Sequence, residues 1–268
     1  MAEGVGDPLV AILALLLLQE GTGTVKGVVE LGHRAPPRRT IHVDADPSAG
    51  VVYPNGLPSE ELVVGDRGGI KWAFVAIIRG FEGKKIPAPA NTLNLDFQRF
   101  QITPRVLGIM QGQELSMRSY DSTLHNMHLL PLKNKESNVG LPDAQTPPYH
   151  RSFSTPEREI KAKCDVHTWE IAWIHVLPHP FHAVTGDDGR FEIKGLPPGR
   201  YTLEACQETC KTKMLEIEVN AGETAVANFI LETIDPPPPF PWLAVSVVAG
   251  ALIALGIVLA FLLLRRGA

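Results

Sequence analysis

Short runs of alternating apolar and polar residues, separated by turn-forming residues, make up most of this chain. Residues 24–30 and 224–231 are two such runs, and the 268-residue sequence contains 24 Gly and 23 Pro. A period of two is typical of half-buried strands, whereas Gly and Pro interrupt regular elements. Apart from the two ends, the sequence shows no long apolar pattern with a helical period. It therefore predicts an all-β fold built from many short strands.

The C-terminal stretch from Trp242 to Leu264 contains 23 residues without a charge. About 20 apolar residues in a helix cross the hydrocarbon core of a bilayer, so this stretch predicts one transmembrane helix. Two Arg follow directly, and positive flanks favour the cytoplasmic side. Residues 265–268 are therefore expected to be a cytoplasmic tail, and the bulk of the chain extracytoplasmic, either periplasmic or at a cell surface. The Pro-rich residues 234–241 are the predicted linker.

A second apolar stretch, Pro8–Leu18, has the length of a signal-peptide core and is too short to span a bilayer. Residues 1–21 are therefore predicted to be a signal peptide. No Lys or Arg precedes the stretch, which departs from the usual positively charged start. An uncleaved second anchor is the alternative.

Composition and motifs argue against several classes of function. The net charge is −4 and no basic stripe is present, so nucleic acid is not an expected partner. The sequence contains no Gly-x-Ser-x-Gly, His-Glu-x-x-His or phosphate-binding loop pattern. An electron-transfer or metal-binding protein is therefore favoured over an enzyme.

Three side chains have the spacing of a metal site: His125 in Leu-His-Asn-Met-His, and Cys164 and His167 in Cys-Asp-Val-His. A thiolate and two imidazoles suit copper or zinc. A Cys that closes one strand, with a His shortly after it, lets a tight loop direct both toward one point, and a His from an earlier strand closes a third side. Two His and one Cys with a weak axial ligand form a blue-copper electron-transfer site.

These residues resemble the cupredoxins, most closely the amicyanin and plastocyanin-like, methylamine-utilisation type. The pattern is a strand with His-Asn-x-His, a long loop (here Lys133–His150), a strand, and a Cys-x-x-His loop. The resemblance is best over residues 101–193 and implies a Greek-key β-sandwich. It also implies that His125, Cys164 and His167 are the equatorial copper ligands.

The axial position departs from this family, because Glu170 stands where Met is expected. A carboxylate is a harder donor than a thioether, so Glu170 is expected to favour Cu(II), to lower the reduction potential, and also to suit zinc. A Glu ligand occurs in nitrosocyanin, a red-copper relative of this fold. Copper binding, zinc binding and a vestigial site in a structural or adhesion module all remain open.

Four other histidines are interpreted differently. His128 lies three residues after His125 and therefore points to the opposite face of a strand. His175 is expected in mid-strand as a core residue, and His179 and His182, which are next to prolines, in a loop.

Cys206 and Cys210 are four residues apart. On a straight strand their Cα atoms would be about 13 Å apart, too far for a disulfide, so a bond between them needs a turn at residues 207–209. A disulfide and two free thiols are both compatible with the sequence.

A second resemblance covers Ala183–Leu231. Its Thr-x-x-x-Gly-x-Phe and Leu-Pro-Pro-Gly-x-Tyr signatures resemble the transthyretin-like carboxypeptidase-regulatory domain, and the strand from Gly23 resembles the start of such a module. The predicted organisation is an opening β segment at 22–60 that could belong to this sandwich, a cupredoxin-like domain at 61–178, and a carboxypeptidase-regulatory-like β domain at 179–233.

These features together predict a membrane-anchored, extracytoplasmic, cupredoxin-like protein. It would bind one copper at His125, Cys164, His167 and Glu170 and either transfer single electrons or handle copper. The stiff linker reaches roughly 20 Å, so a redox partner protein is expected at the membrane.

Overall fold

The computed structural model describes residues 21–83 and 86–234. The predicted signal peptide up to residue 20, most of the linker, the transmembrane stretch 242–264 and the tail 265–268 lie outside these ranges. The described residues up to 232 belong to one compact unit, and residues 233 and 234 belong to a second. In the described part no helix is long and apolar enough to cross a membrane. The described part is rich in sheets, with one short helix, which confirms the all-β prediction.

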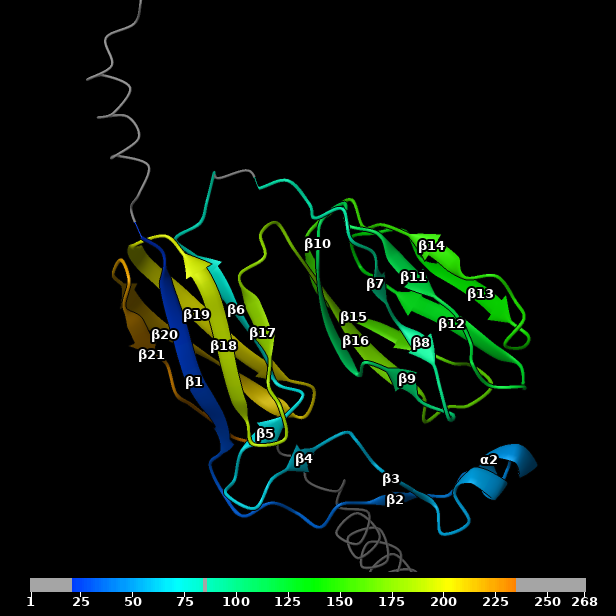
Figure 1. Cartoon of the computed structure of the whole chain (residues 1–268). Coiled ribbons are helices and arrows are strands. Elements are labelled where there is room, and N and C mark those ends of the chain that lie inside the picture. The colour runs from blue at the N-terminus through cyan, green and yellow to red at the C-terminus, as the bar shows by residue number, and fades with distance from the viewer. Residues whose placement is uncertain (1–20, 84–85, 235–268) are drawn as a thin grey trace, which may run out of the picture. The chain divides into compact units, whose positions relative to one another are not determined.

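One group of strands, here called the terminal module, combines both ends of the described chain (Figure 1). Its two sheets have the orders β18-β1-β21, with β22 also paired to β1, and β17-β6-β19-β20. Alternate side chains of β1 are buried, among them Val25 and Val29, and pack in an apolar core with Phe191 and Leu203. The strands of this module are β1 (Gly23–Leu31), β6 (Phe74–Arg79), β17 (His182–Val184), β18 (Arg190–Leu196), β19 (Gly199–Gln207), β20 (Cys210–Val219), β21 (Thr224–Val226) and β22 (Phe229–Leu231).

A second group, here called the central module, contains a five-stranded sheet of order β10-β16-β15-β12-β13, a three-stranded sheet of order β14-β11-β7, and the pair β8-β9. Strand β12 alternates strictly, so His125, Met127 and Leu129 are buried while the residues between them are half-buried. The strands are β7 (Leu93–Asn94), β8 (Asp96–Phe97), β9 (Ile102–Thr103), β10 (Val106–Met110), β11 (Leu115–Met117), β12 (His125–Leu130), β13 (Ser137–Leu141), β14 (Tyr149–Arg151), β15 (Glu157–Lys163) and β16 (Ile171–Leu177).

Residues 32–62, here called the arm, leave β1 and carry β2 (Thr40–Ile41), the helix α2 (Pro47–Val52) and β3 (Leu57–Pro58). Asp46 caps α2, and Pro occupies the first turn, where its missing N–H costs no hydrogen bond. The buried arm residues Val43, Ala49 and Leu57 cluster with Phe100 of the central module. The pair β4 (Val63–Val64) and β5 (Ile70–Lys71) follows the arm.

Two local predictions concern the loop at 133–150 and the pair Cys206 and Cys210. The predicted long loop at 133–150 contains strand β13 and the first residues of β14, because the short edge strand Ser-Asn-Val-Gly-Leu has too few apolar residues to show a clear alternation. The hairpin between β19 and β20 supplies the turn that a Cys206–Cys210 disulfide needs, yet both thiols are free and buried. Cys206 packs with Phe74, whereas Cys210 belongs to the core of the terminal module, so the two cysteines occupy different clusters.

Candidate metal centre

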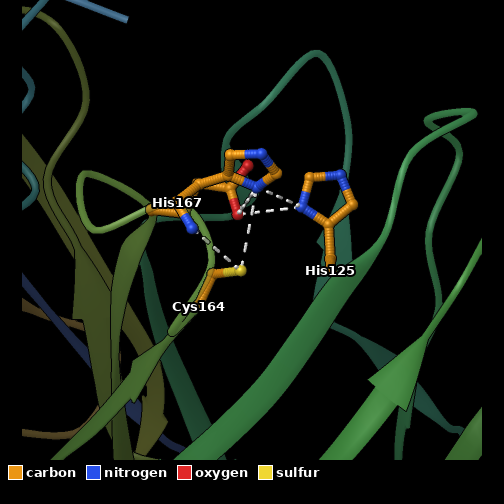
Figure 2. A group of neighbouring side chains, drawn as sticks. His125, Cys164 and His167 are labelled. Atoms are coloured by element: carbon orange, nitrogen blue, oxygen red, sulfur yellow. Dashed lines mark hydrogen bonds and ion pairs between the residues drawn. The ribbon is translucent and has the colours of Figure 1, made fainter. Parts of the chain in front are cut away.

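The four predicted ligands come from neighbouring strands and one tight loop. His125 begins β12, and Cys164 directly follows β15, which pairs with β12 in antiparallel fashion. His167 and Glu170 lie in the loop that leads to β16. The backbone N–H of Cys164 donates to the carbonyl of Glu170 at 3.1 Å, and that of Glu170 to the carbonyl of His167 at 3.0 Å. This closed loop directs its side chains toward His125, as Figure 2 shows for the three labelled residues.

The ligand atoms of these residues lie close together. The Nδ1 atoms of His125 and His167 are 3.1 Å apart, and Glu170 Oε2 is 3.0 Å from the first and 3.5 Å from the second. Cys164 Sγ is 3.8 Å from His167 Nδ1. All four ligand atoms lie within 4.8 Å of one another.

This arrangement fits a metal ion in both size and chemistry. Nitrogen, oxygen and sulfur ligands lie about 2.0–2.3 Å from a bound zinc ion, so separations of 3–4 Å between ligand atoms are those of one coordination shell. Each of the four residues is at most 1% exposed. Glu170 Oε1 has no hydrogen-bond partner among the described residues, and an unsatisfied buried carboxylate oxygen is costly. A cation between the four ligands would offset that cost.

Each imidazole presents Nδ1 to the centre and Nε2 to a carboxylate. His167 Nε2 is 2.9 Å from Asp46 Oδ2, and His125 Nε2 is 3.3 Å from Asp121 Oδ2. The second contact qualifies as an ion pair by distance but lacks hydrogen-bond geometry, so we treat it as electrostatic only. Histidines that bind metals usually donate their other N–H to such an acceptor. The arrangement leaves both Nδ1 atoms available as ligands.

The surrounding acids stabilise positive charge at this point. Burial by itself lowers the pKa of His125, but the nearby Asp121 carboxylate, Cys164 thiol and Glu170 carboxylate outweigh burial and raise the pKa to about 11. The hydrogen bond with His167 lowers the pKa of Asp46. A site that stabilises an imidazolium in this way also attracts a metal cation.

The carboxylate of Asp121 and the rings of Phe97 and Phe100 surround the imidazole of His125. The Asp121 carboxylate accepts the backbone N–H groups of Arg99 and Phe100 at 2.8 and 2.9 Å, and both of these residues have positive φ angles. The ring of Phe97 stacks on His125 with a centroid distance of 4.5 Å. Sequence reasoning missed Asp121 and Asp46, because neither belongs to a recognisable ligand motif.

The other histidines lie outside this centre. His128 is bound to Asp165 and Glu136 at 2.9 and 3.0 Å, away from the four ligands, as its strand position predicted. His175 is a core residue of β16, also as predicted. His182 was expected in a loop but lies in β17, and His179 is buried.

Comparison with known proteins finds one family model that matches part of the chain. Residues 174–232 match the family model of the carboxypeptidase regulatory-like domain, which confirms that resemblance. No curated protein gives a match.

The solved structures found to be similar to parts of the chain include cupredoxins. A purple cupredoxin from Nitrosopumilus maritimus is 18% identical with a TM-score of 0.27, and the match covers 33% of this chain and all of that one. A reduced amicyanin mutant is 12% identical with a TM-score of 0.29, covering 38% of this chain and 98% of that one. The Cu-containing nitrite reductase from Thermus scotoductus SA-01 is 17% identical with a TM-score of 0.30; the match spans 37% of this chain but only 24% of the nitrite reductase.

Proposed function

We propose that this chain is a membrane-anchored, extracytoplasmic copper protein that transfers single electrons or handles copper. The observation that carries the proposal is the convergence of two Nδ1 atoms, one thiol and one carboxylate within 4.8 Å in a buried position. His125 and His167 would bind the ion through Nδ1, Cys164 through its thiolate and Glu170 through a carboxylate oxygen. Copper held there would accept and return one electron.

We assign the central module to a cupredoxin-like Greek-key sandwich and the terminal module to a transthyretin-like sandwich. Strand pairing supports an interleaved organisation, because β6, from within residues 61–178, pairs with β17 and β19. All four proposed ligands come from these positions: His125 and Cys164 lie at the ends of the paired strands β12 and β15, and His167 and Glu170 lie in the loop between β15 and β16. Such a frame favours electron transfer, because ligands held by strands move little when the ion changes its charge.

The membrane part of the proposal rests on the sequence. Residues 1–21 would direct export, residues 242–264 would anchor the chain, and the linker 234–241 would keep the β modules within roughly 20 Å of the outer bilayer surface. Electron exchange with a redox partner protein at the membrane is then favoured over diffusion through solution.

Copper titration of the purified, metal-free protein tests the metal site. We expect one equivalent of Cu(II) to bind with strong visible thiolate-to-copper absorption, and Cys164→Ser to lose that absorption. A chain that takes up no metal would contradict the proposal and leave a structural or adhesion module with a vestigial site.

Zinc is the second candidate for the same site, and Glu170 is the observation that favours it. Two nitrogens, one sulfur and one carboxylate oxygen are an acceptable four-ligand set for zinc. Stoichiometric, colourless zinc binding that copper does not displace would support a zinc-stabilised domain instead of an electron carrier.

Cell fractionation tests the anchor. We expect the full chain in the membrane fraction, with its β modules digested by protease added from the outside. Removal of residues 242–268 should release the protein into the soluble extracytoplasmic fraction. Retention of the shortened chain in the membrane would contradict a single C-terminal anchor.

A further inference from the structure

The arm reaches the metal centre through Asp46. His167 is the ligand whose Nε2 contacts a residue outside the central module: Asp46 Oδ2 lies 2.9 Å away. The two residues are 121 positions apart in the chain, so only the tertiary fold brings them together. The side chain of His167 is 2% exposed and that of Asp46 is 20% exposed, so the carboxylate lies between the imidazole and the solvent.

The two carboxylate oxygens of Asp46 have different partners. Oδ1 accepts the backbone N–H groups of Ser48 and Ala49 at 2.7 and 3.2 Å and thereby caps helix α2. Oδ2 remains for His167. Because the cap fixes the carboxylate at the start of the helix, the oxygen that meets the imidazole has little freedom to turn away.

Further contacts hold the arm against the central module next to the metal centre. The Tyr53 hydroxyl donates to the carbonyl of Arg99 at 2.8 Å. Apolar arm residues cluster with Phe100 and Trp169, and the indole N–H of Trp169 donates to the carbonyl of Phe100 at 3.1 Å. Phe100 and Trp169 also contact the His167 ring, so the arm covers the same surface that holds this imidazole.

The Asp46 contact favours one tautomer of the His167 imidazole. A carboxylate only accepts hydrogen bonds, so it favours the tautomer with a hydrogen on Nε2. Nδ1 then keeps its lone pair and points at His125, Glu170 and Cys164. The same hydrogen bond makes the imidazole a stronger donor to a metal.

We propose that the arm is the outer wall of the metal centre and that Asp46 is a positioning residue that keeps His167 in the Nε2–H tautomer, ready for a metal at Nδ1. The inference rests on the proposed function, because it assigns the arm a role toward the same copper site. It predicts that Asp46 sets the affinity of the site without touching the metal.

Two substitutions of Asp46 separate this role from support of the helix. Serine is a good N-cap but too short to cap α2 and reach His167 at once, so Asp46→Ser keeps the helix and loses the contact. In Asp46→Asn, the single side-chain oxygen caps the helix and the amide N–H faces Nε2, which favours the opposite tautomer with the proton on Nδ1. Asp44→Asn, an exposed acid on the same arm, is the matched control.

The first measurement is made without metal. Nitrogen-15 NMR of the full-length protein should show the Nε2–H tautomer of His167 in the wild type and in Asp44→Asn, a mixture in Asp46→Ser, and the Nδ1–H tautomer in Asp46→Asn. The second measurement is copper affinity, which we expect to fall about 10- to 100-fold in both Asp46 variants and to stay unchanged in Asp44→Asn. Circular dichroism establishes that the variants are folded.

The outcomes distinguish this inference from the proposed function. If the wild type binds copper, and neither the tautomer nor the affinity changes in the folded Asp46 variants, the positioning role is wrong and the copper site stands. If the wild type binds no copper, the proposed function is wrong, while the tautomer comparison in metal-free protein still decides the role of Asp46.

Discussion

Two pairs of histidines in this chain, His125 with His167 and His175 with His182, lie in opposite surroundings. His125 and His167 face Glu170, Asp121 and Asp46, whereas His175 and His182 lie against the ring of Phe74, with centroid distances of 3.9 and 5.4 Å. The neighbouring carboxylates and the Cys164 thiol raise the pKa of His125 to about 11 despite its burial, whereas burial lowers the pKa of His175 to about 3 and that of His182 to about 4.

The comparison shows that burial alone does not make a histidine a metal ligand. The His175 and His182 Nδ1 atoms have no hydrogen-bond partner among the described residues, and no acid compensates a charge there. In the first pair a thiol and a carboxylate lie within reach of both Nδ1 atoms. The acids and the thiol therefore distinguish the candidate metal site from a histidine-containing core.

The largest expected effect is a loss of copper affinity in His125→Phe, with His175→Phe from the other pair as the comparison. His125→Phe keeps a ring against Phe97 but removes a ligand, so we expect copper affinity to fall by more than about 100-fold, beyond the usual effect of an outer-shell change. His175→Phe should keep the copper absorption of the wild type. Equal copper binding by the two variants would contradict the assignment of His125.

Acid unfolding tests the second pair of histidines, His175 and His182. The pKa values of His175 and His182 in the folded chain lie below the ordinary value of 6.5, so the unfolded chain binds more protons between about pH 3 and 6.5. Their contribution to stability is full above pH 6.5 and is lost as the pH falls through this window. One pKa unit corresponds to about 1.4 kcal/mol.

Urea unfolding of the metal-free protein at pH 7 and pH 4.5 measures this loss. We expect the free energy of unfolding of the wild type to fall by about 2 kcal/mol more than that of His175→Phe over this range. If the free energy of unfolding depends on pH in the same way in the wild type and in His175→Phe, His175 accepts a proton in the folded chain without a loss of stability.

Glu170→Met tests whether the Glu170 carboxylate is a ligand at the candidate metal centre. Replacing the carboxylate with a thioether should give a bluer copper site with a higher reduction potential, because a weaker axial ligand favours Cu(II) less. Visible spectroscopy and a redox titration measure both effects. An unchanged spectrum and potential would mean that Glu170 does not reach the metal.

The smallest effect is expected for His128, which also carries acidic partners but faces away from the centre. His128→Ala should leave copper affinity and colour unchanged and alter stability by less than about 1 kcal/mol, because its contacts with Asp165 and Glu136 are partly exposed. A loss of copper binding in this variant would contradict the placement of His128 outside the candidate metal site.

The sequence by itself determined the β architecture and the candidate ligand set. The period of two in β12 turned His125 inward and His128 outward, and the spacing of Cys164, His167 and Glu170 on one short loop is a local property of the chain. Local spacing is readable because neighbouring residues have few ways to be arranged on a strand or in a tight loop.

Only the tertiary structure decided the surroundings of these residues. Asp46 meets His167 across 121 positions, β6 pairs with strands more than a hundred residues later, and Cys206 and Cys210 separate into different clusters despite their spacing. Each outcome depends on which elements pack together, and long-range packing leaves no periodic signal in the residues that take part. The sequence thus identified which atoms could bind a metal, and the fold determined what holds those atoms in place.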